Sequence, residues 1–172
     1  MTRAARWRLV GLAAFVAFAG FWVWALFFAP KEAVNRIGDR AWAERAQEIC
    51  RTADAEREAL ADFRRVDEND PAMLAERGDL IDRVTDVIGR MLDEVVAVDP
   101  TDDKGRAIVP QWEADYRTYL EDRREFADQL RAGRNEPFTE TAVDGIPISE
   151  KLEVFAGDNE MPACAPPHDL AT

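Results

Sequence analysis

The sequence predicts an all-α protein: one transmembrane helix, then an extracytoplasmic three-helix antiparallel bundle, and last an irregular C-terminal arm that a disulfide ties back. Three observations predict this fold class. An uncharged apolar run covers Leu9–Ala29, three later stretches repeat apolar residues at steps of three and four, and two cysteines lie far apart. The expected domains are a cytoplasmic tail over 1–8, the transmembrane helix over 9–29, the bundle over 31–132, and the arm, packed on the bundle, over 133–172.

The apolar run Leu9–Ala29 would form a helix roughly 31 Å long, which matches the hydrocarbon core of a membrane at about 30 Å. Arg3, Arg6 and Arg8 precede it, and positively charged flanks stay on the cytoplasmic side. We therefore expect a single-pass protein of the cell membrane. Its N-terminus would be inside, the bulk of the chain would be exported, and the lipid bilayer would be one partner.

A cleaved signal peptide is the alternative interpretation of the same run. Its apolar region would be shorter, roughly 7–15 residues, and small residues would precede the cleavage site. Phe27 and Phe28 stand where small residues are needed, which favours an uncleaved anchor. Ala13, Ala17 and Gly20 share one face of the expected helix. Small residues at such spacing can pair helices, so a weak homodimer through this face is a further prediction.

The net charge of −12 is distributed unevenly along the 172 residues. Residues 1–30 contain three arginines and no acidic residue, so the remainder of the chain carries −15. A protein that binds nucleic acid needs a basic face to displace counterions from phosphates. The charge therefore argues against a nucleic-acid partner and describes a solvated, acidic domain.

The first bundle helix is expected from Lys31 to Asp67, because apolar residues alternate at steps of four and three in an alanine-rich stretch. Glu56 is the one acidic residue in this seam. The helix should stop at Asn69-Asp70-Pro71. The seam consists of Trp42, Ala46, Ile49, Ala53, Glu56, Leu60 and Phe63.

The second bundle helix should begin with Asp70 as its N-cap and Pro71 in its first position, and end near Val98. Its seam is Leu74, Gly78, Ile81, Val84, Ile88, Met91 and Val95. The third helix is expected from Ile108 to Arg131, with Pro110 in its first turn. Its seam is Trp112, Tyr116, Tyr119, Arg123, Phe126 and Leu130.

The two charged seam residues, Glu56 and Arg123, fall in the same layer when the helices are folded up, down and up. Each would be costly in a core alone, whereas together they can neutralise each other. We therefore predict a structural ion pair that sets the register, with a catalytic or binding role as the alternative. The same layering places Gly78 opposite Phe126.

From Arg134 onward the helical rhythm is lost and prolines and glycines become frequent. Phe138–Ile148 alternates loosely around Asp144-Gly145, which is compatible with a small hairpin. Ser149 can cap a short helix that runs to about Ala156.

The two cysteines, Cys50 in the first bundle helix and Cys164 in the arm, can hold this arm in place. Exported proteins meet an oxidising compartment, and two cysteines there favour one disulfide, worth roughly 4–5 kcal/mol for so long a loop in chain-entropy models. The alternative is two free thiols, one of them catalytic. The sole histidine, His168, stands in a Pro-Pro-His segment and gives that alternative no evident partner.

No established catalytic motif is found, and we expect no catalytic, cofactor-binding or metal-binding residue. The acidic turn Asp99–Gly105 lacks the glycine and glutamate of a calcium loop, although weak calcium binding stays an alternative. Ser149 is the only serine, and nothing groups it with His168. Hydrolysis by carboxylates alone stays open, because acidic residues are abundant.

Four pieces of the sequence together carry a resemblance. They are Trp112–Tyr119, Arg123–Gly133, Phe155–Cys164 and Pro167–Asp169. The chain resembles a group of uncharacterised actinobacterial single-pass membrane proteins with a W-x-x-D-Y-x-x-Y segment and an N-x-M-x-x-C-x-x-P-x-D-like ending. The resemblance implies an anchored, exported helical domain and no particular activity.

The expected function is that of a non-enzymatic, membrane-anchored extracytoplasmic helical module that binds or spaces another envelope or membrane protein. The long helices and the missing catalytic motifs favour it. One alternative is a carboxylate-dependent envelope enzyme, which a pocket holding two close acids with raised pKa values would favour. The other is a sensor subunit that acts through a partner membrane protein.

Overall fold

The computed structural model describes residues 3–28, 33–62, 67 and 70–170. The chain divides into two compact units, Met1–Ala33 and Val34–Thr172. Within the described residues the protein is mostly helical, with the elements α1 (Arg3–Phe27), α2 (Arg40–Leu60), α3 (Pro71–Val96), α4 (Asp103–Arg131) and α5 (Ile148–Asp158), a two-stranded hairpin and a short 3-10 helix.

The first unit contains α1, and here the predicted fold class needs a correction. Among the residues that the structure describes, no helix is both long enough and apolar enough to cross a membrane, so the predicted transmembrane helix over Leu9–Ala29 is not supported. The helix ends at Phe27, before the predicted end at Ala29.

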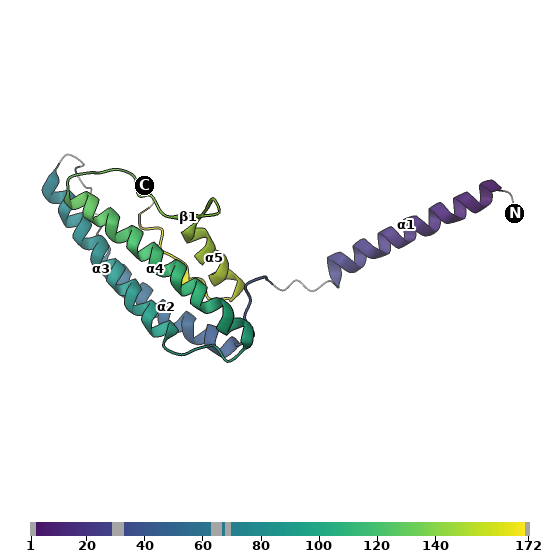
Figure 1. Cartoon of the computed structure of the whole chain (residues 1–172), viewed down its shortest axis with the longest axis horizontal. Coiled ribbons are helices and arrows are strands. Elements are labelled where there is room, and N and C mark those ends of the chain that lie inside the picture. Colours follow the sequence, from purple (N-terminus) through teal and green to yellow (C-terminus); the bar gives the residue numbers. More distant parts are fainter. Residues whose placement is uncertain (1–2, 29–32, 63–66, 68–69, 171–172) are drawn as a thin grey trace. The chain divides into compact units, whose positions relative to one another are not determined.

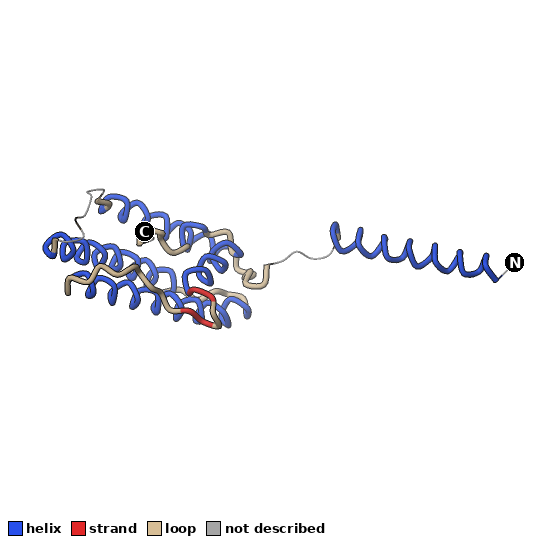
Figure 2. Tube along the Cα trace, turned by 90° about the horizontal axis from the view of Figure 1, so that it is seen from above, coloured by secondary structure: helices blue, strands red, loops and turns tan. Residues whose placement is uncertain are grey.

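The second unit is a helical bundle in which α2, α3 and α4 lie side by side (Figures 1 and 2). α3 packs against both of its neighbours in sequence. The bundle contains more than the three predicted helices. α5 packs on α4, and the short 3-10 helix η1 (Pro162–Cys164) packs on α2 and on α5. Part of the C-terminal arm therefore joins the bundle itself.

α2 is shorter than predicted at both ends. It begins at Arg40, because the Asp39 carboxylate caps it by accepting a hydrogen bond from the backbone N–H of Trp42. It ends at Leu60, where Ala61 takes an extended conformation. The predicted start at Lys31 and the seam residue Phe63 lie outside the described residues.

α3 begins and is capped as predicted, with Asp70 accepting from the backbone of Ala72 and Met73. Each residue of its predicted seam is buried. The predicted position of Gly78 opposite Phe126 is wrong, because the nearest atoms belong to Ala127 and Arg131. A Cβ at Gly78 would lie 2.7 Å from the backbone oxygen of Ala127, so the glycine lets α3 approach the main chain of α4.

α4 starts five residues before the predicted Ile108 and extends to Arg131 as expected. Asp102 caps it by accepting from the N–H of Gly105. Pro110 consequently lies inside the helix instead of in its first turn. Its side chain is exposed, so the ring requires no space in the core.

The predicted hairpin is present as β1 (Ala142–Val143) and β2 (Ile146–Pro147), with Asp144 and Gly145 at positive φ in the turn. The predicted short helix corresponds to α5. Ser149 does not cap it, because its N–H and hydroxyl both donate to the Glu140 carboxylate instead.

The core forms around large aromatic side chains between α2, α4 and α5. The ring of Trp112 stacks on Phe155, with centroids 5.2 Å apart, and meets the edges of Trp42 and Tyr116. A separate, smaller apolar cluster lies near the far end of α4. It consists of Leu74, Ile81, Phe126, Ala127, Leu130 and Leu170.

Candidate functional site

The predicted disulfide between Cys50 and Cys164 is confirmed. It joins the middle of α2 to η1, with the two Cα atoms 5.1 Å apart. Both cysteines are fully buried. The bond fixes the arm against the bundle at a point from which its last residues run along α4.

The predicted ion pair between Glu56 and Arg123 is wrong, because each residue has a different partner. Glu56 is exposed on α2 and binds Arg90 of α3 at 2.5 Å. Arg123 is completely buried and binds Asp169 of the arm. The predicted layers contained only the three helices. In the structure the arm also packs on α4, and it supplies the acidic residue that the buried guanidinium requires.

The guanidinium of Arg123 is satisfied on both sides. Its Nη1 and Nη2 donate to the two oxygens of the Asp169 carboxylate at 2.7 and 2.8 Å, a bidentate geometry. Its Nε donates to Oγ1 of Thr85 at 3.0 Å, and that hydroxyl donates to the carbonyl of Ile81. Burial by itself lowers the pKa of Arg123, but the hydrogen bonds and charge of Asp169 outweigh it, so the pKa lies above its ordinary value.

Three donors along α4 hold successive positions of the arm, and we call them the α4 ladder: Tyr116, Tyr119 and Arg123. The Tyr116 hydroxyl donates to the carbonyl of Cys164 at 3.3 Å, and the Tyr119 hydroxyl donates to the carbonyl of Pro167 at 3.1 Å. From the last residue of η1 onward the arm has no regular secondary structure, so its backbone carbonyls need such side-chain donors. These three residues belong to the seam that was predicted to pack on other helices. In the structure they bind the arm.

Both tyrosines of the α4 ladder resist ionisation. Burial raises the pKa of the Tyr116 phenol, with a smaller contribution from Tyr119. Burial also raises the pKa of Tyr119, although the positive charge of Arg123 acts in the opposite direction. The two phenols therefore stay neutral and serve as donors to the arm over the ordinary pH range.

The start of the second unit is tied to the end of α5 through Asn159. The buried side chain accepts from the N–H of Ile37 at 2.9 Å and donates to the carbonyls of Asn35 and Phe155. Asp158 accepts from the N–H of Asn35 at 3.1 Å. The polar atoms of Asn159 are therefore used in structure.

The acidic turn before α4 also has a structural role. Asp39 accepts from the N–H and hydroxyl of Thr101, and Asp102 accepts from the N–H of Asp39. The backbone hydrogen bonds from Thr101 and Trp42 hold the pKa of Asp39 at about 2. Burial raises the pKa of Asp102, but backbone hydrogen bonds, the first from Gly105, bring it below its ordinary value.

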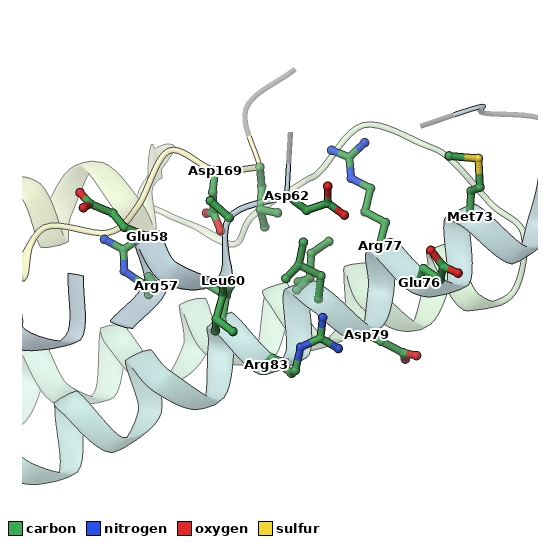
Figure 3. Close-up of a pocket in the computed structure, with 15 residues that line it drawn as sticks. Arg57, Glu58, Leu60, Asp62, Met73, Glu76, Arg77, Asp79, Arg83 and Asp169 are labelled. Atoms are coloured by element: carbon green, nitrogen blue, oxygen red, sulfur yellow. The ribbon is translucent and has the colours of Figure 1, made fainter. Parts of the chain in front are cut away.

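A groove of about 880 Å³ lies between the end of α2, the first half of α3 and the last residues of the arm (Figure 3). In Figure 3 Asp169 lies on the side of Arg57 and Glu58, with Arg77 and Met73 toward the other end. Apolar side chains and charges of both signs line it, among them Leu60, Leu80, Val84, Leu170, Arg83 and Asp79.

A second pocket of about 330 Å³ lies between α4 and α5 and includes Trp112 and Phe155. The indole Nε1 of Trp112 is buried and has no hydrogen-bond partner within the described part of the chain. Lys151 and Asp115, which pair at 2.7 Å, also line this pocket. Over residues 3–28, 33–62, 67 and 70–170, no group of three or more His, Cys, Asp or Glu is placed to hold a metal ion.

The residues predicted for homodimerisation, Ala13, Ala17 and Gly20, all lie on α1 and are exposed. Nothing in the described structure touches a Cβ added at Gly20. The dimer stays a prediction, because a single chain does not test it.

Searches of protein-family models, of curated proteins and of solved structures find no match to this chain. The resemblance to the actinobacterial group stays a prediction.

Proposed function

We propose that Val34–Thr172 is a non-enzymatic interaction module that works outside the cytoplasm, where it binds another protein of the cell envelope. The groove beside Asp169 carries this proposal. It is lined by both apolar and charged side chains, a mixture that suits a protein segment better than a small apolar ligand. The Cys50–Cys164 disulfide supports the compartment, since such bonds persist in oxidising surroundings.

The internal use of the buried polar groups also supports a binding role. The donors of these side chains go to the arm, to backbone carbonyls and, for Arg123, to Thr85 as well; the side chains are Tyr116, Tyr119, Arg123 and Asn159. A carboxylate enzyme would use acids with raised pKa values, whereas the pKa values of Asp39 and Asp102 lie below the ordinary value.

Site-specific photocrosslinking in intact cells tests the proposal. A photoreactive residue at Arg83, an exposed position that lines the groove, should give one discrete adduct of higher mass. The same residue at Glu125, an exposed position of α4 that does not line the groove, is the matched control. The same adduct from both positions, or none from Arg83 under any growth condition, would contradict the proposal.

A further inference from the structure

The tail of the arm occupies two adjacent subsites of opposite chemistry. Asp169 places its carboxylate against the buried fork of Arg123, with both oxygens bound. The next residue, Leu170, is only 4 % exposed and inserts into the smaller apolar cluster beside Phe126 and Leu130. The bundle therefore binds an acidic side chain through Arg123 and the aliphatic side chain that follows it through the smaller apolar cluster.

The charged subsite is preorganised by the bundle and not by the tail. Thr85 of α3 fixes the Nε edge of the guanidinium, and the Tyr119 ring lies 5.7 Å from the guanidinium carbon. Only Nη1 and Nη2 are turned to the carboxylate. A planar fork held in this way distinguishes a carboxylate from a neutral amide by charge and by two parallel hydrogen bonds.

The occupant, by contrast, is held less firmly than the subsites. The disulfide at Cys164 is the covalent cross-link between the arm and the bundle, and Pro167 has the last backbone carbonyl that accepts from the α4 ladder. The His168 side chain is 79 % exposed and the Asp169 side chain is 34 % exposed. Asp169 and Leu170 also line the 880 Å³ groove, so a partner segment in the groove would lie directly against the resident occupant.

We propose that Arg123 and the apolar cluster form a recognition site for a partner's extended peptide segment in which an acidic residue precedes an aliphatic one, and that Asp169-Leu170 is the resident occupant which this segment displaces. The inference rests on the proposed interaction function and names the chemistry of the partner. Because the tail is tethered, it competes at an effective concentration of about millimolar. The apparent affinity of the site for a partner segment is therefore low while the tail occupies it.

Peptide binding to the purified full-length protein tests this. The probe is a fluorescently labelled synthetic peptide with the sequence of residues 165–172, and fluorescence anisotropy gives its affinity. A protein variant carrying Asp169→Asn and Leu170→Ala, with the disulfide intact, should bind the peptide at least tenfold more tightly than the unaltered protein. A control peptide carrying the same two substitutions should lose that affinity.

The outcomes separate cleanly. Equal affinity for the two peptides, or no gain in the double variant, would overturn the recognition site. Adding Arg123→Met to the double variant should remove the binding, and circular dichroism checks that its helices persist. Persistent binding by a folded variant of this kind would also overturn the proposal.

A second measurement does not depend on the folding of any core variant. A polarity-sensitive dye attached at the exposed position 168 reports whether the tail is docked. Millimolar peptide should displace the labelled tail saturably, whereas the control peptide should not, and no displacement at saturating peptide would contradict the inference. A failed peptide experiment together with a discrete crosslink from Arg83 would leave the interaction function standing and remove only this recognition site.

Discussion

α3 and α4 are neighbouring helices of similar length, yet their buried faces differ in chemistry. The buried face of α3 is apolar apart from Thr85, and it packs on other helices. The seam of α4 contains two phenols and a guanidinium, and these bind the irregular arm. An irregular segment brings unpaired carbonyls and an acidic side chain into the interior, so the helix that receives it must offer donors. A buried face rich in donors at helical spacing therefore indicates a nonhelical neighbour.

Removing the disulfide should have the largest effect on the stability of the protein, because it releases the arm from the bundle. Replacing Cys50 and Cys164 by alanine opens a loop with a sequence separation of 114. We expect the free energy of unfolding to fall by about 4–5 kcal/mol in denaturant titrations. Hydrogen exchange should show protection lost in Met161–Leu170 before it is lost in α3. If α3 lost protection first, the arm would not be the dependent partner.

Two glycines of α3 provide a matched pair for the contact between α3 and α4. A Cβ at Gly78 would lie 2.7 Å from the backbone oxygen of Ala127, so Gly78→Ala should cost about 1–3 kcal/mol in the free energy of unfolding. At Gly89 the nearest atom would be a Leu120 methyl carbon at 3.9 Å. Gly89→Ala should stabilise the protein by about 0.5–1 kcal/mol, because alanine favours the helix. Similar costs at both positions would show that the close approach at Gly78 is relieved easily.

The chain contains two tyrosines, and both belong to the α4 ladder. The tyrosinate absorbance of the whole protein therefore reports only on these two phenols. Burial raises the pKa of each phenol above 10.0. The folded state therefore retains protons that the unfolded state releases, and stability falls as the pH rises past about 10. Ultraviolet absorbance should show no tyrosinate until the helices unfold, as followed by circular dichroism. Ionisation of either phenol in the folded protein near pH 10 would contradict the buried ladder, and Tyr119→Phe would identify which one titrates.

The smallest effect is expected at Asp39, which joins the starts of α2 and α4 and takes no part in holding the arm. Its pKa is lowered from 3.8 to about 2 by the hydrogen bonds from Thr101 and Trp42. A lowered pKa stabilises the fold above about pH 4, and this contribution is lost as the pH falls toward 2. The difference in stability between the wild type and Asp39→Asn should therefore shrink over that interval in thermal denaturation. A difference independent of pH would show that the charge of Asp39 contributes nothing.

The sequence predicted some elements well because their signals are local. The cap at Asp70, Pro71 and the aliphatic period together determine α3, and Asp144-Gly145 identifies the hairpin. The start of α2 was missed although its signal is local: the Asp39 carboxylate caps the helix by accepting from the N–H of Trp42. Alanine-rich periodicity alone extended the helix too far in both directions.

The partner of Arg123 was missed for a related reason. Asp169 lies 46 residues away on a segment without any period, so no layering of helices reaches it. The signal that was available is the acidic residue that ends the N-x-M-x-x-C-x-x-P-x-D-like segment. Its cysteine is held to α2 by the disulfide, and each residue after it can reach only a limited stretch of α4. Thr85 carried no such signal, because a threonine on a buried helix face is ordinary.

The hydrogen bonds of Asn159 have a consequence for how the protein is made. Asn159 and its partner Ile37 are separated by 122 positions. At about 5–20 residues per second, a ribosome needs roughly 6–25 s to synthesise the chain between them. During that interval the α3–α4 hairpin can assemble from neighbouring sequence, while Asn35 and Ile37 lack their partner Asn159. Closure of the unit is therefore a late event, which cannot occur before Asn159 has emerged from the ribosome.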